Sequence, residues 1–327
     1  MSAIPVAVIA LGALLFSVSL AGVASAHPYS GIDARDPTQE FITATTDQWF
    51  QWDFHPSIFT GIVILTTLYT LGITVWRKKY NLAEEVDVTR AVIFYADMVL
   101  LWFLLDGPMH HLSDELLFSA HMVQHLGLQL VWAPLLILGT PGWLIRPLLQ
   151  PAWVQKVGRF VSKPSTAFIL FHGVAAIWHL PTMYNLALFS HPWHIVEHVM
   201  FMSVAVNFWW CVLSPVEEVP RATLGRQAAF LFGNMFGMKA LGLIITMHNE
   251  VLYTYYELVP RVWGLSPIGD QRIGGLIMWV PSGLVLWIAL GYVFVQWRRQ
   301  ATPEKGSTGV ARLDGRSPTR QVALVES

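Results

Sequence analysis

Hydrophobic residues in this chain gather in long runs that short polar segments separate. Seven runs follow residue 55, and each is close to the roughly 20 residues that cross a bilayer as a helix. The pattern therefore predicts an all-α polytopic membrane protein with seven transmembrane helices. We place them at Pro56 to Trp76, Arg90 to Asp106, Asp114 to Leu138, Pro164 to Leu180, Pro192 to Leu213, Gly225 to Met247 and Ile273 to Trp297.

An earlier apolar run, from Ile4 to Val23, ends in Ala24-Ser25-Ala26, a small-residue pattern that signal peptidase accepts. It predicts a signal peptide over residues 1–26 and an extracytoplasmic segment over residues 27–55. The seven-helix membrane domain then covers residues 56–299, and a polar, disordered tail covers residues 300–327. Because no lysine or arginine precedes the run, an uncleaved extra helix is the alternative.

Composition supports the membrane class. Hydrophobic residues make up 54% of the 327 positions and charged residues 13%, about half of what a soluble domain carries. The net charge is -1, and the basic residues lie in short loops, so nucleic acid is excluded as a partner. The single cysteine, Cys211, excludes a disulfide framework and a Cys-x-x-Cys site. Metal chemistry must therefore depend on His, Met, Asp or Glu.

Lysine and arginine are concentrated after the first, third, fifth and seventh spans. Basic loops face the cytoplasm in membrane proteins. The mature N-terminus is therefore expected outside and the C-terminus in the cytoplasm. The residues concerned are Arg77, Lys78, Lys79, Arg90, Arg146, Lys156, Arg159, Lys163, Arg221, Arg226, Arg298 and Arg299.

On this topology all but one of the twelve histidines fall on the outer side. His121 and His125 are four residues apart in HMVQH, and His194 and His198 repeat the spacing in HIVEH. Residues four apart share one face of a helix, and facing helices of a bundle can build one metal site. We predict that the two pairs meet on a common ion, with His179 of the fourth span as the fifth ligand.

The identity of the metal depends on the softer donors nearby. Neutral imidazole binds zinc, copper and iron, whereas added thioether favours copper. Met122 and Met183 lie near the histidine layer and Glu197 lies inside HIVEH, so these three are supporting candidates. Methionine is also an ordinary filler of apolar cores. Copper is the predicted metal, with zinc or haem as alternatives.

Two other functions fit the same residues. In an intramembrane zinc-dependent hydrolase three histidines would hold zinc, and Glu197 or Asp106 would act as general base. HIVEH also matches the H-x-x-E-H spelling of a zinc-protease family. In a b-type cytochrome, histidines of two helices would bind haem iron axially. Copper transport would need ligands across the inner half of the bilayer, where few occur, so binding at the outer face is favoured.

Three charged residues lie within the predicted spans. Lys239 is in the middle of the sixth, and Asp97 and Asp106 are on the second. An unpaired ammonium in the bilayer is costly. We therefore predict an ion pair between Lys239 and one of these two carboxylates.

Several segments together resemble a known family. HMVQH followed by APLLILGTP, WHLPTMYN, HPWHIVEHVMF and DQRIGGLIMWVP resemble the multi-spanning CtaG family of cytochrome c oxidase assembly factors, over about residues 49–297. The resemblance implies an assembly factor rather than an enzyme, in the inner membrane of a bacterium. It implies copper delivery to a cytochrome c oxidase subunit, with other assembly factors and membrane lipid as partners. The positions that match its motifs are His121, His125, His179, His194, His198, Asp270 and Gln271.

Overall fold

The computed structural model describes residues 52 and 54–301, and within them the regular structure is entirely helical. The predicted signal peptide, nearly all of the predicted segment over residues 27–55 and residues 302–327 of the predicted tail lie outside the described residues. Six helices are long and apolar enough to cross a membrane: Pro56–Lys79, Val88–Leu116, Phe118–Gly139, His191–Leu213, Leu224–Met247 and Pro267–Ala301. A seventh span exists if Ala152–Val161 and Pro164–Trp178, which are bent by 71° against each other, act as one. The all-α, multi-span prediction is confirmed.

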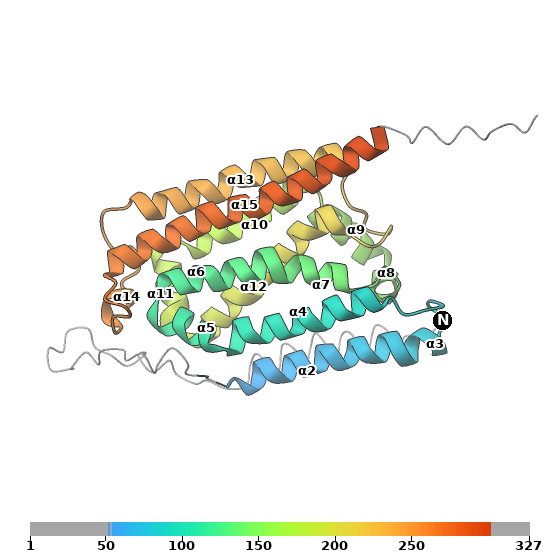
Figure 1. The fold of residues 1–327 in the computed structure, drawn as a ribbon, viewed down its shortest axis with the longest axis horizontal. Helices are drawn as coiled ribbons and strands as arrows, with labels where there is room; N and C mark the ends of the chain where they lie inside the picture. Colours follow the sequence, from blue (N-terminus) through green and yellow to red (C-terminus); the bar gives the residue numbers. More distant parts are fainter. Residues whose placement is uncertain (1–51, 53, 302–327) are drawn as a thin grey trace, which may run out of the picture.

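The long helices form an elongated bundle in which shorter segments close both ends (Figure 1). Its first half consists of α2 (Pro56–Leu71), η2 (Gly72–Trp76), α3 (Arg77–Lys79), α4 (Val88–Asp106), α5 (Pro108–His111), η3 (Leu112–Leu116), α6 (Phe118–Gly127), η4 (Leu128–Trp132) and α7 (Ala133–Gly139). Its second half consists of α8 (Gly142–Ile145), η5 (Arg146–Leu149), α9 (Ala152–Val161), α10 (Pro164–Trp178), α11 (Pro181–Phe189), α12 (His191–Leu213), α13 (Leu224–Met247), α14 (Tyr255–Leu258) and α15 (Pro267–Ala301).

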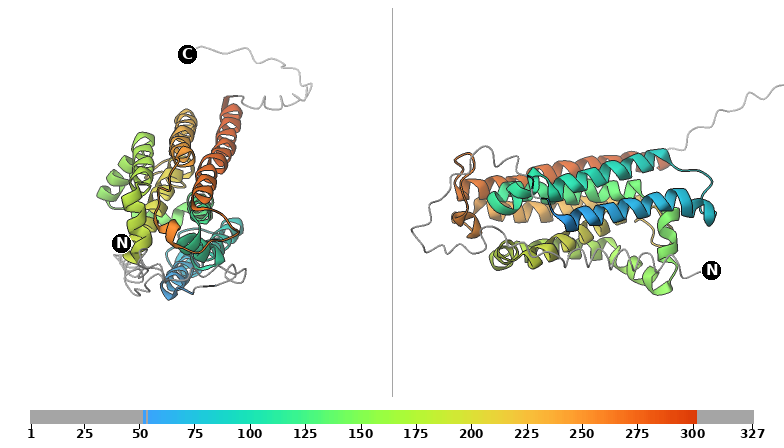
Figure 2. Two further views of the ribbon diagram at one scale, coloured as in Figure 1. Left: turned by 90° about the vertical axis from the view of Figure 1, so that its left-hand side faces the viewer. Right: turned by 90° about the horizontal axis from the view of Figure 1, so that it is seen from below.

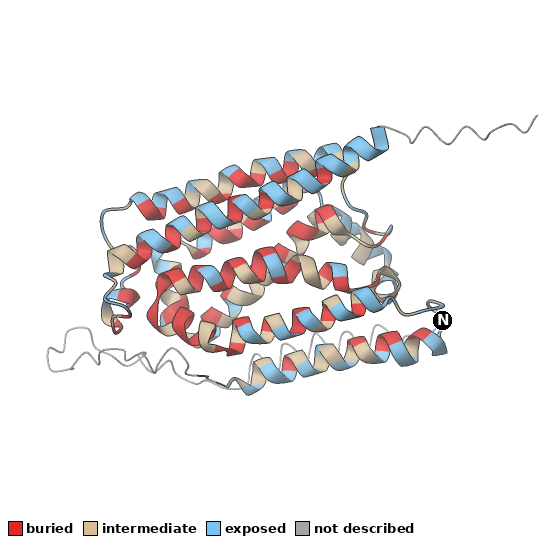
Figure 3. Cartoon of the chain, viewed as in Figure 1, coloured by how far each residue is buried: buried red, intermediate tan, exposed pale blue. Residues whose placement is uncertain are grey.

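The path from α6 through η4 to α7 runs through the middle of the bundle. In its most apolar 18-residue stretch 61% of the residues are buried, against 22% in the path that starts with α2. Figure 3 shows the same contrast, with buried positions crowded on α6 and exposed ones along α2 and α15. Apolar side chains exposed on the outer helices suit a lipid environment, and α6 is shielded from it.

Proline and aspartate set where several helices begin. Pro56, Pro164, Pro181 and Pro192 lie in the first turns of α2, α10, α11 and α12, where the missing N–H has no intrahelical partner to lose. The side chain of Asp87 accepts a hydrogen bond from the backbone N–H of Arg90 and caps α4.

The basic loops meet at one end of the bundle. Arg146 Nε lies 2.9 Å from Glu218 Oε1, and Arg159 Nε donates to the carbonyl of Glu218 over 2.7 Å. These contacts join the α7–α10 connection to the α12–α13 loop. Helices α5, α11 and α14 lie at the opposite end, as two further views confirm (Figure 2). The first turns of α6 and α12, which carry the paired histidines, belong to that opposite end.

The structure differs from the predicted third span at its start. We expected one helix from Asp114, but the backbone is extended at Leu117, with φ -134° and ψ 124°. The chain therefore turns between η3 and α6. As a result, η3 lies beside the start of α6 instead of extending it, which places Asp114 on the histidine cluster.

Candidate metal centre

Four imidazole rings from α6 and α12 meet inside the bundle. The ring centroids of His121 and His125 are 4.3 Å apart, and those of His194 and His198 are 4.6 Å apart. Between the helices, His125 lies 4.9 Å from His198, and His121 lies 5.8 Å from His194. The i,i+4 spacing thus places both rings of each pair on the face that meets the other helix.

The α12 pair is joined by a carboxylate from η3. Asp114 Oδ2 lies 3.3 Å from His194 Nδ1, while Nε2 of His194 lies 2.8 Å from Nε2 of His198. A carboxylate on one ring nitrogen fixes the tautomer and directs the lone pair of the other nitrogen outward. Asp114, His194 and His198 are all buried, and they offer donor atoms within 4.8 Å of one another. We call them the Asp114 set.

The α6 pair has its own carboxylate, supplied by α12. His121 Nε2 lies 3.9 Å from Glu197 Oε1, and His121, His125 and Glu197 offer buried donor atoms within 4.8 Å of one another. We call them the Glu197 set. A separation of 3.9 Å is too long for a hydrogen bond. It is close to the separation of two ligands on one metal ion, whose bonds are about 2.0–2.2 Å each.

Several donor atoms of both sets have no hydrogen-bond partner although they are buried. They are both ring nitrogens of His121, Nε2 of His125, Nδ1 of His198 and Oε2 of Glu197. His121 is fully inaccessible and Glu197 is 2% exposed. A buried polar atom without a partner costs about 1–3 kcal/mol, so such a group of atoms needs partners, which an ion or ordered water can supply.

His179 lies beside the cluster but outside both sets. Its Nδ1 is 2.7 Å from the carbonyl oxygen of Ala175. Because a carbonyl can only accept, Nδ1 carries the hydrogen, and the buried Nε2, which has no partner, is left with a free lone pair. Its ring and that of His125 both contact Phe201. It is thus held in the tautomer that a ligand needs.

A tyrosine from the α13–α14 loop supports this part of the site. The hydroxyl of Tyr253 donates to the carbonyl of His179 over 3.2 Å. Burial, and then the nearby charge of Glu197, raise the pKa of Tyr253 above its usual value. The hydroxyl therefore stays protonated and keeps its role as donor.

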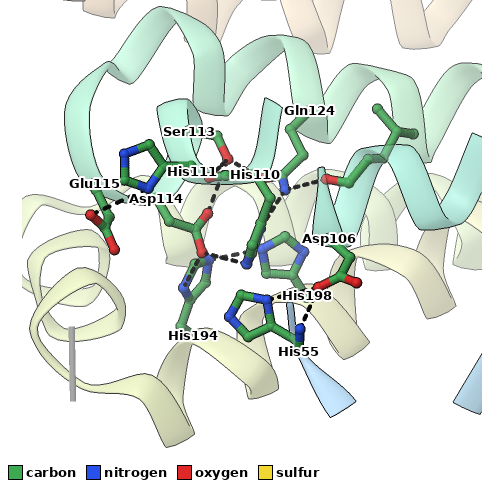
Figure 4. A network of polar contacts seen from close by, with 11 residues as sticks. His55, Asp106, His110, His111, Ser113, Asp114, Glu115, Gln124, His194 and His198 are labelled. Atoms are coloured by element: carbon green, nitrogen blue, oxygen red, sulfur yellow. Dashed lines mark hydrogen bonds and ion pairs between the residues drawn. The ribbon is translucent and has the colours of Figure 1, made fainter. Parts of the chain in front are cut away.

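A polar network connects the Asp114 set to the end of the bundle (Figure 4). His110 Nε2 lies 3.2 Å from Asp114 Oδ2, and Nδ1 of the same ring lies 2.9 Å from Gln124 Nε2. Since the Gln124 amide nitrogen donates, Nδ1 accepts and Nε2 of His110 holds the hydrogen that faces Asp114. The tautomer of His110 is thereby fixed as well.

A second contact of this region ties α2 to α4. Nδ1 of His55 lies 3.0 Å from Asp106 Oδ1, and Trp102 Nε1 donates to Asp106 Oδ2 over 2.9 Å. Asp106 is fully buried, and His55 is 24% exposed.

The other predicted supporting residues serve the scaffold. Both carboxylate oxygens of Asp270 accept hydrogen bonds from the start of α6. Gln271 accepts from the backbone N–H of Leu252 and so holds the loop after α13. Met122 belongs to the main apolar core, and Met183 packs against a smaller apolar cluster that includes Trp178.

The predicted ion pair of Lys239 is absent from the described part of the chain. Asp106 binds His55 instead, and both oxygens of Asp97 are buried without a hydrogen-bond partner. Lys239 lies on α13, which packs along α15, and its side chain passes close to Gly283. The prediction failed because it used depth in the bilayer alone, whereas α4 and α13 face different neighbours.

Asp114 is the main residue that sequence reasoning missed. It precedes His121 by seven residues, which would place both on one face of a continuous helix. That spacing was a usable signal, but the break at Leu117 brings Asp114 to His194 of α12 rather than to His121. Asp106 and His55 are 51 positions apart, so no local sequence pattern could have predicted their contact.

Taken together, the helices and this site define a multi-span membrane protein with a buried imidazole and carboxylate cluster near one end. Residues 67–300 match the family model described as cytochrome c oxidase caa3 assembly factor (Caa3_CtaG). The chain belongs to this family, as its motifs indicated.

Similar chains occur in mycobacteria. The uncharacterized proteins Mb0105 of Mycobacterium bovis and MT0111 of Mycobacterium tuberculosis are each 26% identical over 265 residues. The uncharacterized protein ML1998 of Mycobacterium leprae is 27% identical over 270 residues. Each match covers 76% of this chain and 40% of the relative, so the chain spans less than half the length of these proteins. No solved structure matches the chain.

Proposed function

We propose that this chain binds copper at the histidine cluster and helps to deliver it to a cytochrome c oxidase during assembly. The observation that supports this most directly is the convergence of His121 and His125 with His194 and His198, including buried ring nitrogens that have no other partner. A purely structural cluster would be expected to satisfy these nitrogens with hydrogen bonds.

The choice of copper follows from the donors and from the family. Neutral imidazole is a common copper ligand, and the chain offers no cysteine near the cluster, since its one cysteine donates to the carbonyl of Ser162. The assembly of a haem-copper oxidase needs a protein that presents copper. Membership of an oxidase assembly family therefore favours copper over zinc.

The location of the cluster suits delivery outside the cytoplasm. It lies near the end of the bundle opposite the basic loops (Figure 1). By the positive-inside rule those loops face the cytoplasm, which puts the cluster toward the outer side of the membrane. A protein at this location would present metal at the outer face without transporting it across the bilayer.

The test is elemental analysis of the detergent-purified protein after exposure to copper and removal of loose metal. The double variant His121→Ala/His198→Ala takes one ligand from each pair and is expected to abolish stoichiometric copper while the helical circular dichroism is unchanged. His172→Ala is the matched control, because it removes an imidazole of the same bundle that binds Asn234 and belongs to neither set. Full copper retention by the double variant contradicts the proposal.

A zinc-dependent hydrolase is the main rival outcome. It would be supported by zinc in place of copper in the purified protein and by hydrolysis of lipid or peptide that Glu197→Gln abolishes. A Soret band in the visible spectrum would instead identify a b-type cytochrome.

A further inference from the structure

We infer that the cluster holds two metal ions, one on the Asp114 set and one on the Glu197 set, rather than a single ion shared by four histidines. The inference rests on the proposed function, since it specifies how copper is bound. Three observations support it: the six donor side chains separate into two sets, each set carries its own carboxylate charge, and the distances within each set fit one ion.

The six donor side chains form two sets of the same composition. Each set has two imidazoles from one helix, four residues apart, and one carboxylate from a different helical segment. Asp114 comes from η3 to meet the α12 pair, whereas Glu197 comes from α12 to meet the α6 pair. Five of the six side chains are at most 4% exposed, and His198 is partly buried.

The charges favour one ion in each set. Two neutral imidazoles and one carboxylate carry a single negative charge, which one Cu(I) ion neutralises. A single divalent ion would have to contact both Asp114 and Glu197, which belong to different sets.

The distances fit separate ions. Two nitrogens on one metal, with bonds of about 2.0–2.1 Å, lie about 2.9 Å apart at a right angle. Nε2 of His194 and Nε2 of His198 are hydrogen-bonded to each other over 2.8 Å, and they can share an ion once the hydrogen between them is displaced. His121 Nε2 and Glu197 Oε1, at 3.9 Å, can span a second ion. The rings of His125 and His198, one from each set, are 4.9 Å apart, so the two sets adjoin.

A metal pair gives the site a way to hand over its cargo in steps. The Asp114 set is connected through His110 and Gln124 to the network at the end of the bundle, whereas the Glu197 set lies between α6 and α12.

The experiment measures copper per chain after anaerobic loading of the intact protein with Cu(I) and removal of excess metal by a chelator of known affinity. Two equivalents are expected in the wild type and one in each of Asp114→Asn and Glu197→Gln. Glu115→Gln is the matched control, because Glu115 is next to Asp114 but pairs with His111; it should keep both ions.

Electron paramagnetic resonance of the fully Cu(II)-loaded wild type provides a second measurement that needs no variant. Two ions bound in adjoining sets should show spin coupling. One equivalent in the wild type, or the loss of all copper in both carboxylate variants, overturns the two-ion inference and leaves the proposed copper site in place. No copper in the wild type overturns the proposed function itself.

Discussion

The carboxylate of Asp270 on α15 caps helix α6 at Phe118, whose backbone N–H donates to Asp270 Oδ2 over 2.7 Å. The N–H of the next residue, Ser119, donates to the other oxygen over 3.1 Å. The residue that precedes α6, Leu117, offers no capping side chain, so Asp270 supplies a cap from 152 positions away. The cap fixes the start of the helix that carries His121 and His125.

We expect Asp270→Asn to lower the free energy of unfolding by about 1–2 kcal/mol, since an amide replaces a charged helix cap. Copper affinity should fall by about tenfold, because ligand-orienting contacts typically have effects of this size. Thermal unfolding and a chelator competition measure the two quantities.

Asp87→Asn is the control for this change. Asp87 caps α4 through Arg90, far from the histidines, so its loss should affect stability and leave copper affinity unchanged. Equal copper affinity in the two variants would show that the α6 cap does not position the ligands.

Gly274 allows α15 to contact α6 closely. A Cβ added at Gly274 would overlap the ring of Phe118 and approach Met122. We expect Gly274→Ala to destabilise the fold by about 1–3 kcal/mol through overpacking. Gly291→Ala, on the same helix but with open space around it, should change stability little. A thermal unfolding comparison that finds both variants equally stable would contradict the predicted contact.

His55 fixes the start of α2 through Asp106. We expect His55→Ala to cost about 1–3 kcal/mol, because the buried Asp106 loses a side-chain partner. Copper stoichiometry should be unchanged, since His55 belongs to neither donor set. His248→Ala is a suitable control, because the ring of His248 is hydrogen-bonded to the backbone of the nearby Glu250 and belongs to neither donor set. Loss of copper in His55→Ala would extend the site to the end of the bundle.

The sequence predicted the helical spans and the paired histidines because both depend on local spacing. Apolar runs of span length can be read directly, and residues four apart share a helix face in any bundle. The carboxylates were harder, because their partners depend on how the chain turns. Asp114 reaches His194 only because the backbone breaks at Leu117.

The motif DQRIGG also shows that contacts between distant segments cannot be predicted from local spacing. The sequence marked Asp270 and Gln271 through a resemblance, and its metal-supporting role remains a prediction. In the structure Asp270 caps α6 and Gln271 holds the loop after α13. Gly275 packs against Gly242 and Thr246 of α13. No local pattern could assign these contacts, which join segments far apart in the chain.

His179 offers the sharpest test of where the site ends. Its Nε2 is buried, has a free lone pair and lies outside both sets. We expect His179→Ala to keep the number of bound copper ions and to weaken affinity by about tenfold, as for a group that supports the ligands without being one of the main donors. His179→Gln, which restores a polar side chain, should recover part of the affinity. Loss of a whole equivalent of copper in His179→Ala would instead make His179 a primary ligand, as the sequence spacing first suggested.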